Sequence, residues 1–290
     1  MDGGKGQPLG DNLEIAALSM ADVRRRRWNQ AKSLHSNIQK GKPDLRLPEN
    51  MVKAAFVERL NRFAMLADVN GRRVLCHVAN SGRLRELLSP ANTLWLSAAP
   101  LPTNPKATKR KTTHDLRLVD VEGVLVSADA RLPNHLLREA IESGRLPEFA
   151  GFDQVRSEVT HGDSRLDLLL TGGSSTCLVE AKSVTLVSPI GDERGERVAL
   201  FPDAPTSRGR KHVLNLCNAV KEGYRAAVVF VVQRPDADVL VPDVASDPDF
   251  YEALVEANVH GVEIYAYRCR VSLKEVAITD RIPVRLDGLG

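Results

Sequence analysis

Two short apolar segments of this chain carry charged residues at positions where a buried strand normally has none. They are SRLDLLL at residues 164–170 and TCLVEAK at residues 176–182, and they contain Asp167, Glu180 and Lys182. Ionised groups in an apolar strand are costly unless they are paired or bind a metal. Two converging carboxylates could hold Mg²⁺ or Mn²⁺, and a nearby lysine could position a water molecule or offset phosphate charge. The pattern predicts a site that acts on phosphodiesters of nucleic acid.

The spacing of these residues indicates how they would meet. Residues i and i+2 of a strand share one face, so Glu180 and Lys182 point the same way. If the two segments pair as a hairpin, Asp167 can face Glu180. The alternative is a surface ion pair on an edge strand, because a Glu-x-Lys triplet is common by chance. Apolar neighbours on both sides favour the metal site over the exposed edge.

Two charged residues just upstream extend this candidate site. Arg165 lies two residues before Asp167, and its guanidinium suits bidentate contacts to a phosphate of DNA. An equally good alternative for Arg165 is a salt bridge that holds Asp167 or Glu180 in place. Glu158 could supply a further carboxylate to the metal, or it could be an ordinary exposed strand residue.

The segment FPDAPTSRGRKH, residues 201–212, combines a proline-rich loop with the start of a helix. Thr206 or Ser207 could cap that helix, and Arg208 and Lys211 lie in its first turns. Unpaired amides and the helix dipole favour phosphate at such an end, so these cations are expected to bind DNA. Gln233 ends the apolar segment VVFVV and is expected to line the same surface.

Polar and cationic residues also gather in the first half of the chain, where they are expected to follow a nucleic-acid backbone. They are His77, Asn80, Arg83, Lys109, Arg110 and Lys111. The alternative for His77 is a structural histidine with its hydrogen bonds satisfied. Phe63 and Trp95 could stack on bases, although with only 4% aromatic residues in the chain a place in the core is the stronger expectation.

The elements that would position these residues fall into two groups. Between Met51 and Asp129, five or six short apolar or alternating segments are separated by turn signals, which favours a small closed β-barrel of the OB type. From residue 134 onward, strands alternate with helices expected at 134–144, 210–223 and 248–261. That alternation indicates an α/β domain with a mixed central sheet.

Composition excludes several classes of protein. A chain of 290 residues with 43% hydrophobic and 27% charged residues is expected to be soluble and globular, with no membrane segment. Four scattered cysteines favour reduced thiols in the cytoplasm. Residues 1–46 hold nine Lys and Arg against five Asp and Glu, so the net charge of +3 comes from this segment. No phosphate-binding loop, dinucleotide fingerprint or serine-hydrolase elbow is present.

Several long motifs resemble the sugar fermentation stimulation protein A family. Among them are HVANSGRLRELL, SEVTHGDSRLDLLL, VEAKSVTL, FPDAPTSRGRKH and FVVQRPDA, in the order that the family has them. The resemblance covers about residues 50 to 275 and implies an OB-like barrel followed by a restriction-endonuclease-like domain of the PD-(D/E)XK type. By this resemblance Asp167, Glu180 and Lys182 occupy the two acidic positions and the lysine position of the nuclease motif. Leu166 replaces the motif's proline.

Composition predicts a flexible basic extension (1–46), which lies outside the family's usual span. The resemblance divides the rest into a barrel domain (47–130) and a nuclease-like domain (131–290). It implies a DNA-binding protein with a Mg²⁺ or Mn²⁺ site, connected with the regulation of sugar-metabolism genes. Three functions remain open at this point: a nuclease, a regulator that binds DNA without cutting it, and a protein-interaction module. The retained acidic pair favours the nuclease, because bare carboxylates repel phosphate. The description of the resembled family as DNA-binding, with a name taken from sugar metabolism, favours the regulator.

Overall fold

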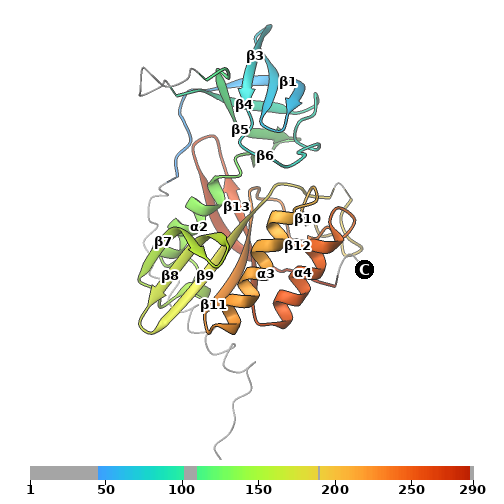
Figure 1. The fold of residues 1–290 in the computed structure, drawn as a ribbon. Coiled ribbons are helices and arrows are strands. Elements are labelled where there is room, and N and C mark those ends of the chain that lie inside the picture. The colour runs from blue at the N-terminus through green and yellow to red at the C-terminus, as the bar shows by residue number, and fades with distance from the viewer. Residues whose placement is uncertain (1–44, 101–109, 189, 288–290) are drawn as a thin grey trace, which may run out of the picture. The chain divides into compact units, whose positions relative to one another are not determined.

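The computed structural model describes residues 45–100, 110–188 and 190–287 (Figure 1). Lys109 and nearly all of the basic extension expected at residues 1–46 lie outside these ranges. None of the helices in the described part of the chain is both long enough and apolar enough to span a membrane.

Five strands near the start of the described chain close into a barrel. They are β1 (Met51–Asn61), β2 (Ala64–Val69), β3 (Arg72–His77), β4 (Thr93–Ala98) and β5 (His114–Val121). Strand β1 pairs with β2 and β4, β2 pairs with β3, β4 pairs with β5, and a parallel pairing of β3 with β5 closes the ring. Strand β6 (Val124–Ser127) then extends the sheet beyond β5. The expected OB-type barrel is therefore confirmed.

Local sequence explains how this barrel turns. Asn70 and Gly71 join β2 to β3 with φ angles of 52° and 81°, the backbone of a tight hairpin turn, and both residue types tolerate it. The strands alternate, so apolar residues such as Met65, Leu94 and Leu116 point inward and are almost completely buried.

The second domain contains a six-stranded mixed sheet in the order β14-β13-β11-β9-β8-β7. Its strands are β7 (Gln154–His161), β8 (Ser164–Gly172), β9 (Ser175–Val184), β11 (Arg225–Val232), β13 (Glu263–Val271) and β14 (Val276–Ile282). Strands β9, β11 and β13 are parallel to one another, whereas β7, β8 and β14 pair antiparallel with their neighbours. The expected mixed sheet is confirmed.

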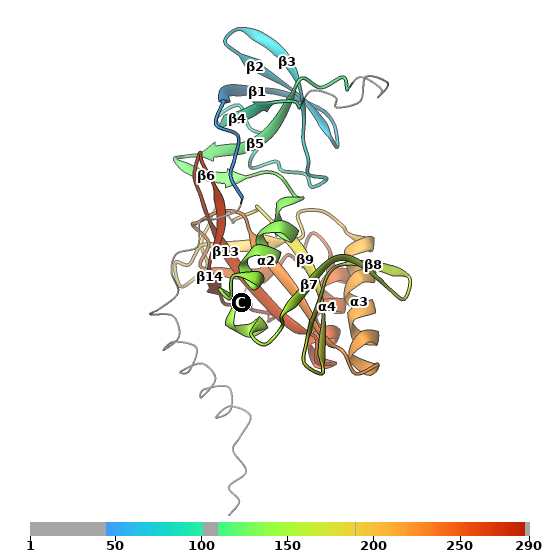
Figure 2. The ribbon, with the colours of Figure 1, turned by 90° about the vertical axis from the view of Figure 1, so that its left-hand side faces the viewer.

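Helices cover both faces of this sheet. Helix α2 (Leu132–Glu142) packs against one face, and α3 (Ser207–Lys221) and α4 (Pro248–Val259) pack against the other (Figure 2). After Arg225, strand β11 is apolar because both its faces are covered: Val229 and Val231 face the α2 side, and Val228 and Phe230 face the α3 side.

Strand β14 was not predicted, and neither were three short elements. They are the 3₁₀ turn η1 (Pro147–Phe149) and the strands β10 (Val198–Phe201) and β12 (Val239–Pro242), which pair in parallel. Each strand has four residues, too few for a periodic pattern to identify. Helix α2 begins two residues earlier than expected, because Pro133 fits the first turn of a helix.

Candidate functional site

The antiparallel pairing of β8 with β9 brings the first two acidic residues together. Leu168 lies opposite Val179, so Asp167 and Glu180 occupy facing positions at the next step along the two strands. The Oδ2 atom of Asp167 accepts a hydrogen bond of 2.8 Å from the amide of Ala181. The two carboxylates therefore lie on neighbouring strands as the sequence predicted.

Glu180 and Lys182 share a face of β9 and meet a histidine from helix α3. Oε1 of Glu180 accepts a 2.6 Å hydrogen bond from Nζ of Lys182 and lies 2.5 Å from Nδ1 of His212. All three side chains are buried, with exposed fractions of 4%, 8% and 7%. The other carboxylate oxygen, Oε2, is buried and has no hydrogen-bond partner. Such an oxygen is costly to leave unsatisfied, which favours a bound ion or water at this point.

The surroundings keep Glu180 ionised. Burial alone would raise the pKa of Glu180, but the hydrogen bond from His212 and the nearby ammonium of Lys182 outweigh it and hold the pKa below its ordinary value. Nε of Arg208 lies 3.5 Å from Nε2 of His212. A donor facing Nε2 favours the histidine tautomer with its proton on Nδ1, where it points at Glu180.

Asp167 has the opposite electrostatic balance. Burial, followed by the negative charge of Glu180, raises its pKa from 3.8 to about 6. The Ala181 amide and a 2.6 Å hydrogen bond from Nδ2 of Asn134, on helix α2, lower that pKa only in part. A cation beside Asp167 and Glu180 would relieve this repulsion, so the pair is suited to hold one.

These side chains line one pocket of about 330 Å³. Asp167, Glu180 and Lys182 contribute from the sheet, and Arg208 and His212 from helix α3. Ser81 of the barrel and Ala130, just before helix α2, line it as well. The pocket therefore combines two carboxylates with several cationic or protonatable groups, the composition needed to receive a phosphate beside a metal ion.

The residues present fit a hard divalent cation that keeps part of its water shell. Carboxylate oxygens suit Mg²⁺ and Mn²⁺, and Mg²⁺ is often held by one or two carboxylates together with substrate phosphates. Within the described ranges, no group of three or more His, Cys, Asp or Glu side chains is arranged to hold a metal. Asp167 and the unpartnered Oε2 of Glu180 would thus supply only part of the ligand set.

Glu158, expected as a further metal ligand, does not join this pair. Its backbone has a φ of +58°, and its carboxylate pairs with the guanidinium of Arg165. The Glu158 side chain is 62% exposed and is absent from the pocket lining. Arg165 does line the pocket, with a side chain that is 60% exposed.

The start of helix α3 places the expected cations differently. Thr206 is the N-cap, and its Oγ1 accepts a hydrogen bond from the amide of Gly209. Arg208 faces the pocket with His212, four residues later on the same side of the helix. Lys211 points elsewhere, and its ammonium pairs with Asp163 at 2.8 Å.

Gln233 lies inside the protein, in contrast to the expectation that it lines a DNA-binding surface. Its side chain has no exposed surface. Its Oε1 accepts from Ser127 of the barrel, and its Nε2 donates to the carbonyl of Asp129 and to Ser183. The amide of Gln233 therefore joins the barrel to the end of the sheet.

The expected barrel residues fall into two places. His77 and Arg110 both approach the buried carboxylate of Asp115, and Lys111 is exposed beside them. Asn80 is buried and its Oδ1 accepts from the amide of Gly82, so it shapes the turn that follows. Arg83 is exposed. Only the turn with Asn80 and Arg83 reaches the pocket region, through Ser81.

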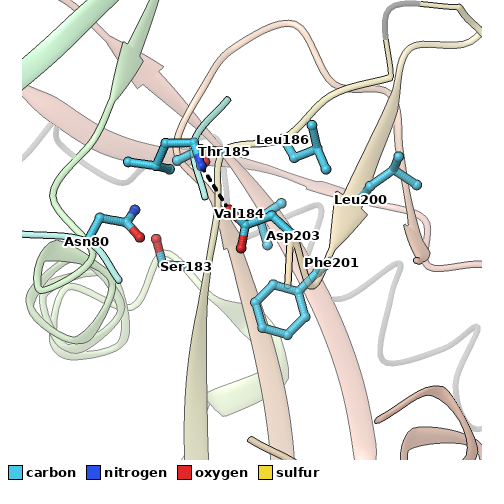
Figure 3. Close-up of a pocket in the computed structure, with 9 residues that line it drawn as sticks. Asn80, Ser183, Val184, Thr185, Leu186, Leu200, Phe201 and Asp203 are labelled. Atoms are coloured by element: carbon cyan, nitrogen blue, oxygen red, sulfur yellow. Dashed lines mark hydrogen bonds between the residues drawn. The ribbon is translucent and has the colours of Figure 1, made fainter. Parts of the chain in front are cut away.

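A second, much smaller cavity of about 20 Å³ lies beside this turn (Figure 3). Asn80, Ser183 and Asp203 line it, and Oδ2 of Asp203 accepts a 3.2 Å hydrogen bond from the amide of Leu84. The volume suffices for one water molecule. The hydrogen bond between Leu84 and Asp203 joins the barrel turn to the loop that leads into helix α3.

Two residues of the pocket were not recognised as site residues from the sequence. His212 falls in the helix predicted at 210–223 and Asn134 begins the helix predicted at 134–144, but neither was predicted to belong to the site. The four-residue spacing of Arg208 and His212 could have placed both on one helix face. Nothing in the sequence indicates that Asn134 would donate to Asp167, because that contact depends on how α2 packs against the sheet.

Comparisons with known proteins give one consistent result. Residues 57–128 match the model "SfsA N-terminal OB domain", and residues 131–275 match "Sugar fermentation stimulation protein RE domain". A sugar fermentation stimulation protein homolog of Desulforamulus reducens is 44% identical over 240 residues, covering 83% of this chain and 94% of that protein. The homolog of Moorella thermoacetica is 43% identical over 241 residues, covering 83% and 99%.

A solved structure is also similar. The SfsA protein of Pyrococcus furiosus, described in complex with Ca²⁺, superimposes with a TM-score of 0.72 at 28% sequence identity. The match covers 84% of this chain and all of that one.

Proposed function

Because this chain belongs to the sugar fermentation stimulation protein family, we propose that it binds DNA and hydrolyses phosphodiester bonds with the help of a divalent cation. The observation that carries the proposal is the convergence of Asp167, Glu180 and Lys182 in one pocket, with one oxygen of Glu180 buried and unpartnered. An exposed structural ion pair would not leave a carboxylate oxygen buried and unpartnered in a residue that lines a 330 Å³ pocket.

Asp167 and Glu180 would hold the cation, Mg²⁺ or Mn²⁺. The similar structure from P. furiosus, described with Ca²⁺, supports a preference for hard divalent cations, which take oxygen ligands. When bound, such an ion would supply Lewis acidity at the phosphate and lower the pKa of a coordinated water.

The chain's own residues would carry out the remaining work. Lys182, whose Nζ donates a hydrogen bond to Glu180, would position the attacking water and offset the charge that develops on the phosphate. Arg208 and Arg165, both on the pocket lining, would bind the non-bridging phosphate oxygens. The water loses a proton to solvent as its oxygen forms a bond to phosphorus. The bond from phosphorus to one ester oxygen breaks, and that oxygen takes a proton from solvent.

A second candidate function is DNA binding without cleavage, as in a regulator. The observation that favours it is the absence, within the described residues, of a third His, Cys, Asp or Glu ligand beside Asp167 and Glu180. An incomplete ligand set would bind metal weakly, and the pocket could then serve as a platform for a phosphate backbone.

A cleavage assay separates the two functions. Labelled single-stranded DNA, duplex DNA and RNA are incubated with the protein in Mg²⁺, in Mn²⁺ or in EDTA. We expect metal-dependent cleavage that Asp167→Ala and Lys182→Ala abolish, whereas Asp163→Ala, an exposed acid outside the pocket, leaves it unchanged.

Three other outcomes would contradict the nuclease. Binding that survives EDTA and strengthens in the Asp167→Ala variant, without cleavage, would favour the regulator. Cleavage that persists in both pocket variants would place the chemistry elsewhere. An affinity that does not fall with salt would remove both candidates, because phosphate contacts release counterions.

A further inference from the structure

A half-exposed aromatic side chain lies at the turn between β1 and β2 of the barrel. Phe63 is 50% exposed and Leu60, at the end of β1, is 46% exposed. The sequence favoured a core position for Phe63, yet the structure presents its ring to solvent. An aromatic ring this exposed offers a free face on which a nucleic-acid base can stack.

One arginine fixes this turn in place. The guanidinium of Arg59 donates hydrogen bonds to the carbonyls of Arg62, Asn80 and Arg83. Oδ1 of Asn61 also accepts a 2.9 Å hydrogen bond from the amide of Phe63. The turn with Phe63 is therefore clamped onto the turn with Asn80 and Arg83, so the ring is held on an ordered backbone.

The clamped turns lead directly to the pocket. The carbonyl of Phe63 accepts a 2.9 Å hydrogen bond from the amide of Val78, and the carbonyl of Ala79 accepts a 3.0 Å hydrogen bond from Ala130. Ala130 and Ser81 both line the pocket that holds Asp167 and Glu180. Phe63 thus belongs to a short, hydrogen-bonded path of backbone that ends at the candidate active site.

The charges along this path favour an anionic partner. Arg62, Arg83 and Arg85 are exposed, and none of them forms an ion pair with another residue of the described part of the chain. Glu58 is an exposed acidic residue close by in the sequence, on β1. Exposed guanidiniums without ion pairs, on or next to the two linked turns that carry an exposed aromatic ring, resemble the surfaces on which OB folds bind single strands.

We propose that the turn Asn61–Phe63 and the turn Asn80–Arg83 form a docking surface for an unpaired DNA strand that continues into the pocket. Phe63 stacks on one base, and Arg62 and Arg83 contact the adjoining phosphates. Stacking of this kind needs a base whose face is free, so it selects single-stranded over duplex DNA. The inference rests on the proposed function, since it names the substrate class of the same site.

The test measures affinity in EDTA, by fluorescence anisotropy of a labelled single-stranded DNA of about 12 nucleotides, a length that an OB fold can cover. We expect Phe63→Ala to weaken binding by about 5- to 100-fold, the usual effect of removing one stacking side chain. Phe63→Trp should retain the affinity because the larger ring still stacks. Arg83→Ala should reduce the slope of log affinity against log salt by about one.

Controls separate this surface from general damage. Val259→Ala truncates a side chain that is 78% exposed at the end of α4, and it should leave affinity unchanged. Affinity for the matching duplex should be the same in the wild type and in Phe63→Ala. Equal losses for single strands and duplexes, an unchanged affinity in Phe63→Ala, or binding of RNA alone would overturn the proposal. The binding assay needs no cleavage, so its result can be distinguished from the result of the nuclease test.

Discussion

The raised pKa of Asp167 predicts how one substitution changes stability with pH. In the metal-free protein, burial and the charge of Glu180 raise the pKa of this carboxyl from 3.8 to about 6. A raised folded-state pKa means that the folded protein holds this proton more tightly than the unfolded chain does. The stabilisation that results is fully present below the unfolded value of 3.8 and is lost as the pH rises through about 6.

The shift is roughly two pKa units, which corresponds to about 3 kcal/mol above pH 6. Asp167→Asn removes the charge, and its side-chain oxygen can still accept from the amide of Ala181. The weakening of that bond is already contained in the shift, because the Ala181 amide is one of the groups that set the pKa of Asp167. We therefore expect the variant to be more stable than the wild type by about 3 kcal/mol at about pH 8, and equally stable at about pH 4.

Urea unfolding in EDTA, followed from about pH 4 to about pH 8, measures this difference. Asp163→Asn is the control with the opposite sign, because hydrogen bonds from Lys211 and then Asn215 lower the pKa of Asp163. Its variant should lose stability only as the pH rises. Two results would refute the electrostatic explanation of the pocket. One is a difference in the free energy of unfolding between Asp167→Asn and the wild type that does not change with pH. The other is a variant less stable than the wild type at high pH.

Two further substitutions test neighbouring contacts. Gly82→Ala should lower the midpoint of thermal unfolding, because a Cβ at Gly82 would clash with Oδ2 of Asp203. Calorimetry should show this loss, and the double variant with Asp203→Ala should recover part of it. No recovery would mean that another contact of the turn is responsible. His212→Ala removes a hydrogen-bond donor of Glu180 and should raise the pKa of that carboxyl. The pH profile of metal-dependent cleavage should therefore move to higher pH. The move should be smaller in His212→Gln, because glutamine keeps a donor. An unshifted profile in His212→Ala would show that His212 does not act through Glu180.

The convergence of Asp167, Glu180 and Lys182 could be anticipated because it depends on local rules. Strand alternation places Glu180 and Lys182 on one face, and a hairpin brings Asp167 to the facing position. The closed barrel followed for the same reason, since its strands and turns are readable from short segments such as Asn70-Gly71.

The contacts that were missed depend on packing between distant elements. His212 reaches Glu180 only because α3 lies on that face of the sheet, and Asn134 reaches Asp167 only because α2 covers the other side of β8 and β9. Gln233 ends a buried strand, as expected, but the barrel covers that strand end and uses its amide. Glu158 turns away because its backbone adopts a positive φ, which strand alternation does not foresee.

The most direct measurement is the position of a bound cation. Crystals of the protein grown with Mn²⁺ would be examined by anomalous diffraction at the manganese edge. We expect an anomalous peak in the pocket, within bonding distance of Asp167 and of Oε2 of Glu180, that is absent from Asp167→Ala crystals. A pocket without a peak at saturating Mn²⁺, or a peak that persists after Asp167→Ala, would contradict the claim that these two carboxylates hold a metal.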